Sequence, residues 1–148
     1  MIKFTSILFC FLFCVTLVLA QESPDEAAVK ETINNYFAGV TQGDTLRLRK
    51  AFHPTASMKY VDYKTNAYND VAIGDFINRL KASAGKKTDR KTKIVYINIS
   101  GTAAQARLEI DGGTFYFHDF MNLLKINGEW KIVSKIFWRE EKVTAGSK

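Results

Sequence analysis

The chain has 148 residues, of which 47% are apolar and 13% aromatic, and its formal net charge is +6. This length suits one domain with a substantial core. The densest basic cluster, residues 86–93, falls between two periodic segments where a solvated loop is expected, and no nucleic-acid recognition motif accompanies it. We therefore interpret the positive charge as a solubility feature and expect no nucleic-acid partner.

Residues 1–20 have the order of a secretory signal peptide. Lys3 gives a short positive region, residues 7–19 are an apolar run, and Ala20 ends the segment with a small residue. We expect cleavage near Gln21, export to the periplasm or the medium, no membrane attachment afterwards and a single domain over residues 21–148. The alternative is an uncleaved N-terminal anchor.

Both cysteines, Cys10 and Cys14, lie inside this apolar run. The mature chain would then have no disulfide, thiol nucleophile or thiolate metal site. The two histidines and the carboxylates show no metal-ligand spacing, and no glycine-rich phosphate loop is present, so we expect neither a metal nor a cofactor.

Three helices are expected in the first part of the mature chain. Apolar residues recur at three- and four-residue spacing over residues 27–41 and 73–84, and Asp44 can cap a short helix over residues 45–51. Between the second and third helices, alternation predicts a strand at 57–63 and a short partner at 66–71.

Four long strands follow. Residues 93–100 and 103–111 are expected to pair through Gly101-Thr102, so that Ile99 faces Ala104, Ile97 faces Ala106 and Val95 faces Leu108. Residues 114–126 then lead into the last hairpin. Helices followed by an antiparallel meander predict an α+β domain, in which a curved antiparallel sheet wraps around three N-terminal helices.

The last hairpin is the strongest local signal. Asn127-Gly128 joins two apolar-rich runs, and both residues tolerate the positive φ of a two-residue turn. The turn fixes the register and therefore the faces of the two strands. The expected pairs are Ile126 with Glu129, Leu123 with Ile132, Met121 with Ser134, Asp119 with Ile136, and Phe117 with Trp138.

One carboxylate, that of Asp119, interrupts the apolar face that this register defines. A carboxylate in an apolar wall is either a satisfied structural group or the polar group of a pocket. We expect Asp119 to be shielded from water and within hydrogen-bond reach of a tyrosine or a histidine. Alternation places His118 on the opposite face unless a bulge intervenes.

The order of elements and several motifs resemble the nuclear transport factor two-like superfamily. The motifs are A-A-V-K-E-T-I-N-N-Y-F-A-G-V in the first helix, Gly43-Asp44, A-F-H-P at residues 51–54 and G-E-W-K-I-V at residues 128–133. Within it, the chain is most similar to an exported bacterial group labelled “putative lumazine-binding”. The resemblance implies a cone-shaped pocket between the helices and the concave sheet face, but it does not specify a function.

His53 is a second candidate for proton transfer, because the resemblance places the F-H-P motif close to the pocket mouth and histidine exchanges protons near neutral pH. A histidine that only fixes the turn between helix and strand is the alternative. Aromatic and soft side chains would line the pocket, although each can equally be a core residue. The candidate ligand-binding residues are Tyr36, Phe37, Phe52, Met58, Tyr60, Phe76, Phe115, Phe117, Met121 and Trp138.

Three functions remain open at this point. The first is a non-catalytic binder of a small, planar or aromatic molecule. The second is an isomerase or dehydratase in which Asp119 removes a proton and Tyr60, Tyr36 or His53 stabilises the oxyanion. The third is an interaction domain whose pocket is filled by side chains.

The convex face of the sheet is expected to form a homodimer interface. On the last hairpin this face would be too apolar to be fully solvated, and a two-fold interface is the commonest way to cover such a patch. Its apolar members would be Tyr116, Phe120, Leu124, Ile126, Val133 and Phe137, with Asn122, Lys131 and Lys135 at the rim.

Overall fold

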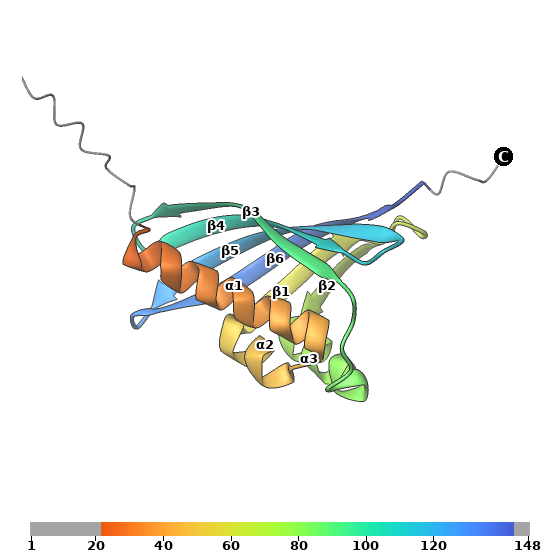
Figure 1. The fold of residues 1–148 in the computed structure, drawn as a ribbon, viewed down its shortest axis with the longest axis horizontal. Helices are drawn as coiled ribbons and strands as arrows, with labels where there is room; N and C mark the ends of the chain where they lie inside the picture. The colour runs from red at the N-terminus through yellow and green to blue at the C-terminus, as the bar shows by residue number, and fades with distance from the viewer. Residues whose placement is uncertain (1–21, 144–148) are drawn as a thin grey trace, which may run out of the picture.

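The computed structural model describes residues 22–143, so the expected signal peptide lies outside the described residues. In this part of the chain, three α-helices and a short 3-10 turn pack against a six-stranded sheet (Figure 1). The elements are α1 (Pro24–Gln42), α2 (Thr45–Ala51), β1 (Phe52–Val61), β2 (Tyr68–Ala72), α3 (Ile73–Leu80), the 3-10 turn (Lys81–Ser83), β3 (Lys91–Ser100), β4 (Ala103–Asp111), β5 (Phe115–Ile126) and β6 (Glu129–Glu141).

Capping residues set the limits of the first two helices. Ser23 accepts a hydrogen bond from the Glu26 amide, and α1 begins at Pro24, three residues earlier than predicted. Gly43 ends α1 with a φ of 66°. Asp44 accepts from the amides of Leu46 and Arg47 and starts α2 as predicted.

Two element boundaries differ more from the prediction. The third helix ends at Leu80 and tightens into the 3-10 turn instead of continuing to Ala84. Strand β1 begins at Phe52, directly after α2, instead of at Ser57. Pro54 is tolerated there because the β1 residues with assigned strand partners are Phe52 and then those from Ser57 onward.

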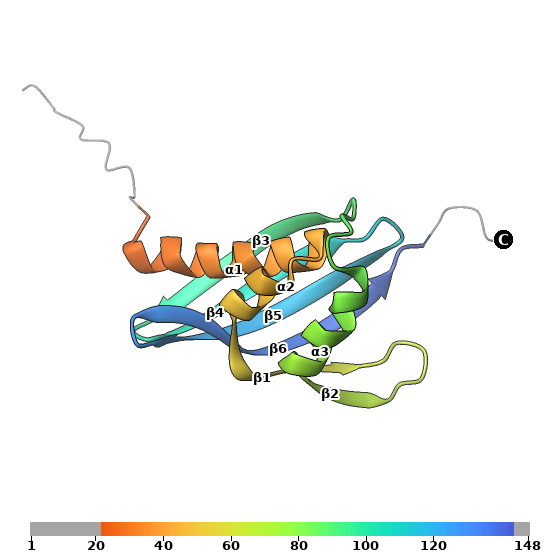
Figure 2. The ribbon, with the colours of Figure 1, turned by 90° about the horizontal axis from the view of Figure 1, so that it is seen from below.

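The sheet is curved and open, with the strand order β2-β1-β6-β5-β4-β3. The α+β prediction is confirmed. The prediction of an all-antiparallel sheet was wrong for one pair, because β1 and β6 run parallel and the sheet is therefore mixed. No short turn joins these two strands, so local sequence does not set their relative direction. The three helices lie across one face of the sheet (Figure 2).

The last hairpin begins as predicted and then changes register. Asn127 and Gly128 have φ values of 51° and 84°, and the expected pairs Ile126–Glu129 and Leu123–Ile132 are present. Beyond them, Asn122 pairs with Ser134, because Val133 is an extra residue in β6.

The expected pairs beyond Val133 were therefore wrong. Met121 faces Lys135, Asp119 faces Phe137 and Phe117 faces Arg139. A similar irregularity beside Val95 places Ile94, not Val95, opposite Leu108, whereas the Ile97–Ala106 and Ile99–Ala104 pairs are as expected.

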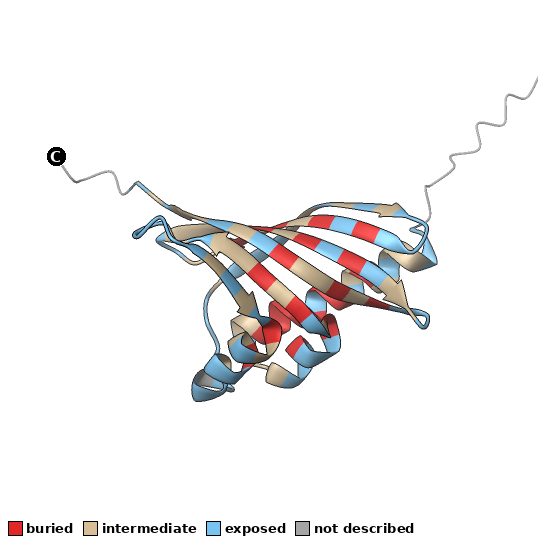
Figure 3. Cartoon of the chain, turned by 180° about the vertical axis from the view of Figure 1, so that it is seen from behind, coloured by how far each residue is buried: buried red, intermediate tan, exposed pale blue. Residues whose placement is uncertain are grey.

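Buried and exposed residues alternate along the central strands (Figure 3). The buried members form one core between the concave sheet face and the helices. The largest of the fully buried side chains are Val29, Ile33, Tyr36, Leu48, Ile77, Leu108, Ile110, Asp119, Met121, Leu123 and Ile132. The exceptions to the apolar types expected inside a protein are the phenol of Tyr36 and the carboxylate of Asp119.

Candidate functional site

Asp119 lies on the concave face of β5 with 0% exposure. Tyr36, from the middle of α1, donates its hydroxyl proton to Asp119 Oδ2 at 2.5 Å. Lys135, from β6, donates from Nζ to Asp119 Oδ1 and to Tyr36 Oη, each at 3.1 Å. The expected hydrogen bond between Asp119 and a tyrosine is therefore confirmed. We refer to Tyr36, Asp119 and Lys135 as the buried triad.

Lys135 is the residue that sequence reasoning missed. A regular strand would have placed it on the convex rim, but the bulge at Val133 turns it inward, where only 5% of the residue is exposed. Its Nζ lies 4.2 Å from the centroid of the Phe137 ring and 5.4 Å from that of Tyr36. Because Ile136 and Trp138 are apolar, the sequence favoured the regular register, in which they face the cone. No local signal marks the bulge.

Charge and burial act together on Tyr36. Burial raises the pKa of the Tyr36 phenol well above its usual range, and the negative charge of Asp119 and the hydrogen bond to it act in the same direction. Arg90 opposes this shift to a smaller extent. The phenol therefore keeps its proton and acts as a hydrogen-bond donor to the carboxylate at neutral pH.

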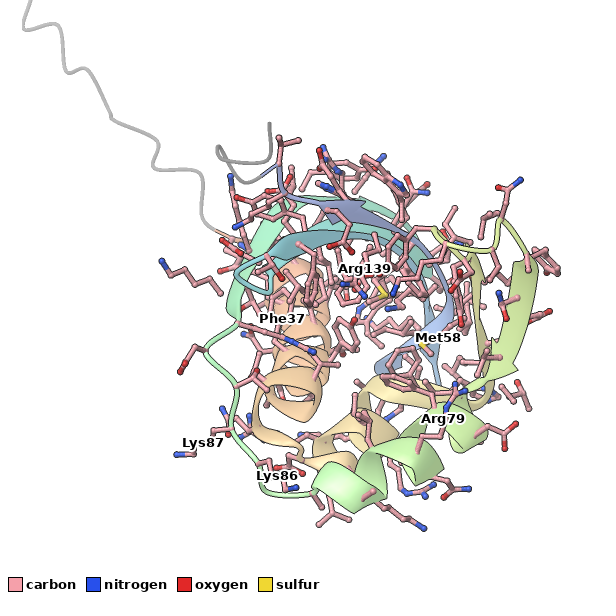
Figure 4. All side chains as sticks on the ribbon, turned by 90° about the vertical axis from the view of Figure 1, so that its right-hand side faces the viewer. Phe37, Met58, Arg79, Lys86, Lys87 and Arg139 are labelled. Carbon is pink, nitrogen blue, oxygen red and sulfur yellow. The ribbon has the colours of Figure 1, made fainter. Side chains whose placement is uncertain are left out.

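The open end of the cone lies next to the triad. Figure 4 looks into this end, with α1 on one side, α3 below and the sheet arching above. The rings of Tyr60 and Phe137 are stacked here with centroids 4.5 Å apart.

Two of the hollows that the Tyr60–Phe137 pair lines lie at this end of the cone. One, of about 260 Å³, is also lined by Met58, Phe76, Arg79 and Leu80. The other, of about 230 Å³, is also lined by Val61, Asp62, Tyr63, Phe117 and Arg139. The triad lines neither of them, and Phe137 is the side chain that both contacts Lys135 and forms part of each wall.

The lining of the two hollows contains two cations, Arg79 and Arg139, and one anion, Asp62. Arg139 places its guanidinium carbon 4.2 Å from the centroid of Phe115 and 4.6 Å from that of Tyr63, with Glu141 2.8 Å from its Nε. Arg79 adds an exposed cation to the other wall. A ligand with a negative or electron-rich group would fit this lining.

The predicted pocket residues fall into three groups. Met58, Tyr60, Phe76 and Phe117 line the two hollows. Phe37, Phe52 and Met121 are buried: the rings of Phe37 and Phe52 pack on Tyr36 with centroids 5.9 and 5.8 Å away, and Met121 pairs with Lys135 across the strands. Phe115 packs on Phe117 and Arg139.

The third group lies away from the cone. Trp138 was expected in the pocket, but the bulge turns it to the convex face, where it is 56% exposed and stacks on His118. His53 lies at the start of β1, whereas the hollows adjoin the end of that strand. Its Nδ1 is 2.8 Å from the Thr55 hydroxyl, a local contact that fits the turn-fixing alternative.

The convex face carries its own polar cluster. His118 Nε2 lies 2.8 Å from Glu140, and Arg107 lies 3.5 Å from His118 Nδ1 and 3.1 Å from Glu109. The expectation that His118 and Asp119 point to opposite faces is confirmed.

The composition of the predicted convex patch needs correction. Phe137 and Lys135 point inward, and Ile136 and Trp138 take their places. These two residues help to line a shallow hollow of about 330 Å³ on the sheet, whose other lining residues are Lys59, Tyr60, Val61, Tyr68, Phe120 and Phe137.

Within residues 22–143, no group of three or more histidine, cysteine or acidic side chains could hold a metal ion. In the same part of the chain, no helix has the length and apolar character needed to cross a membrane.

Comparison with known proteins places the chain in a family. Residues 24–138 match the family described as “Putative lumazine-binding”. A nuclear transport factor two-like protein of unknown function from Shewanella baltica is 32% identical, with a TM-score of 0.72 over 80% of this chain and 95% of that one. One from Methylobacillus flagellatus is 31% identical, with a TM-score of 0.69 over 80% and 94%.

A curated relative has an enzyme name. Aldolase FrzH of Cladobotryum is 26% identical over 116 residues, which cover 78% of this chain and 91% of that protein. The chain belongs to the “Putative lumazine-binding” family of the nuclear transport factor two-like superfamily, as its sequence motifs indicated.

Proposed function

We propose that this member of the “Putative lumazine-binding” family binds a small, flat, aromatic or heteroaromatic molecule at the open end of its cone. The observation that carries the proposal is the stacked Tyr60–Phe137 pair, which forms a wall of both hollows. Each hollow is smaller than the roughly 300–1,000 Å³ typical of ligand pockets. A ligand larger than one hollow would therefore insert where the two rings now stack.

The lining suits such a ligand in two ways. Aromatic faces on Tyr60, Phe117 and Phe137 offer stacking surfaces, which favour planar rings. Arg139 and Arg79 offer donors to carbonyl or anionic oxygens at the ligand edge. Together they favour a planar molecule that carries electron-rich oxygen atoms.

The first probe is lumazine, because the family description names it. Titration of the purified chain is expected to give saturable binding that Tyr60→Ala and Phe137→Ala each weaken. Tyr96→Ala is the matched control, since Tyr96 is a partly exposed tyrosine on β3, outside both hollows. Equal affinity in all four proteins would contradict this location of the site.

An enzyme that transfers protons is the second candidate. It is favoured by the carboxylate of Asp119 beside the donors Tyr36 and Lys135, and the name of the aldolase relative supports carbonyl chemistry. In this alternative, Asp119 removes a proton next to a carbonyl group and Tyr36 or Lys135 stabilises the enolate oxygen. Retained binding with lost turnover in Asp119→Asn would distinguish it from a binder.

We also propose that the chain is exported and that the mature protein begins near Gln21. The supporting pattern is the positive, apolar and small-residue order of residues 1–20. An intact-mass measurement on protein recovered from an exporting cell tests it. A mass that retains Cys10 and Cys14 would contradict cleavage.

A further inference from the structure

The amine of Lys135 lies in an unusual environment for a lysine. Its side chain is 7% exposed, its Nζ contacts the face of Phe137, and its hydrogen bonds go to Asp119 and Tyr36. Lysine is almost never this buried without a partner. A structural ion pair would need only the Asp119 carboxylate beside the amine. Here the Tyr36 phenol contacts both groups, so that the three side chains are joined by a closed ring of hydrogen bonds.

We propose that Lys135 is an amine nucleophile that forms an imine with a small aromatic aldehyde or ketone. The proposal rests on the proposed binding pocket, because the carbonyl compound must enter beside Phe137, which forms part of both hollows and covers the amine. The class of ligand thereby narrows from aromatic molecules to aromatic carbonyl compounds.

The triad supplies the groups that imine formation needs. Asp119 Oδ1 is 3.1 Å from Lys135 Nζ and can accept the proton that makes the amine nucleophilic. The free amine attacks the carbonyl carbon, a C–N bond forms, and the carbonyl oxygen becomes the hydroxyl of a carbinolamine. Tyr36 Oη, 3.1 Å from the same nitrogen, is placed to pass a proton to that hydroxyl, which leaves as water. Asp119, which is hydrogen-bonded to Tyr36 through Oδ2, returns to the phenol the proton that it took from Lys135, so the carboxylate and the phenol end as they began.

The overall step balances without a further reactant. The ammonium group of Lys135 and the carbonyl compound give a protonated imine and one water molecule, and the C=O bond is replaced by C=N. The positive charge stays on the nitrogen, so its pairing with the Asp119 carboxylate is preserved. The fold therefore accommodates the same buried positive charge in the ammonium of Lys135 and in the protonated imine.

The test is reductive trapping with benzaldehyde and sodium borohydride, in which hydride adds to the imine carbon and fixes a benzyl group on the nitrogen. Peptide mapping of the wild-type chain is expected to show Lys135 labelled at least about tenfold more than Lys50 or Lys64, because a positioned amine reacts faster than a free one. Lys50 and Lys64 are exposed lysines and serve as internal controls.

Two variants separate the roles within the triad. Lys135→Arg keeps a cation for Asp119 but cannot form the imine, so the specific adduct should disappear. Tyr36→Phe keeps the amine and the carboxylate and should slow trapping. Circular dichroism shows whether each variant is folded. The peptide mapping of the wild-type chain tests the proposal even if neither variant folds.

Benzyl alcohol separates this inference from the binding proposal, since it has the same ring without the carbonyl group. Saturable binding of benzyl alcohol in ligand-observed NMR, with benzaldehyde labelling no stronger at Lys135 than at Lys50, would overturn the imine and leave the pocket standing. Absence of saturable binding for both compounds, with labelling only at exposed lysines, would overturn both.

Discussion

His118 and Asp119 are neighbours on β5 and meet opposite environments. Asp119 is fully enclosed on the concave side, where a phenol and an amine satisfy it. On the convex side, His118 shares its contacts with Glu140 and Arg107, whose side chains are 45% and 34% exposed. Each face of the sheet thus has a charged cluster, but only the concave one is separated from water.

The difference shows how burial changes the consequence of losing one partner. In a buried cluster, the remaining charge has no water to replace the lost group, so removal is costly. In a part-exposed cluster, water and salt screen the charges and each pair contributes little. The predictions below test this contrast, beginning with the largest effect.

Asp119→Asn should cause the greatest loss of stability, because it leaves the Lys135 ammonium buried without a counter-charge. Breaking a buried pair in this way costs on the order of 3–5 kcal/mol, measured as the free energy of unfolding in urea. Glu140→Gln is the matched control on the convex face, and it should cost about 1 kcal/mol or less. Equal losses of unfolding free energy in the two variants would contradict the contrast between the two faces.

The double variant Asp119→Asn/Lys135→Met sharpens the same test. Once both charges are gone, a substantial part of the loss should be recovered, and the double-mutant cycle gives the coupling free energy between the pair. Strict additivity of the two single changes would contradict the contact.

Tyr36→Phe should have an intermediate effect, about 1–3 kcal/mol for a disturbed buried hydrogen bond, and it should change the alkaline pH dependence. The pKa of Tyr36 is higher in the folded chain than in the unfolded chain. Above about pH 10, the unfolded chain releases this proton while the folded chain keeps it, so stability falls as pH rises. Urea unfolding at neutral and alkaline pH should show a smaller fall in the variant.

Trp138→Glu tests the convex face. We propose that the exposed apolar residues there, among them Ile136 and Trp138, form the interface of a homodimer. Sedimentation equilibrium at micromolar concentration should show a dimer in the wild type and a monomer in the variant. Leu46→Glu is the matched control, because Leu46 is 78% exposed and lies on α2, on the face of the sheet that the helices cover. A monomeric wild type would refute the proposal.

Asp25→Asn should have the smallest effect and should act at acid pH. Hydrogen bonds from Lys125 and then Trp130 lower the pKa of Asp25, and they join the start of α1 to the last hairpin. A lowered pKa gives stability that is present above the unfolded value of 3.8 and is lost as pH falls through the folded value. The variant should therefore lose less stability between neutral pH and pH 3 or so in acid-unfolding curves.

The sequence predicted the elements because their signals are local. The cap residue Asp44 and the turn residues Asn127-Gly128 specify their conformations within a few positions, and the structure has them where they were expected. The inward direction of Asp119 followed from counting back along β5 from that turn, since β5 has no extra residue of its own. The family motifs then identified the fold.

Tertiary structure decided which β6 side chains face the cone. The extra residue Val133 exchanged the two faces of β6 beyond it, bringing Lys135 and Phe137 inward and sending Trp138 outward. Its position depends on how β6 fits β1 on one side and β5 on the other, and no local sequence pattern marks that fit. The sequence determined that a carboxylate faces the cone, whereas only the bulge in β6 and the packing of α1 against the last hairpin determined that an amine and a phenol meet it there.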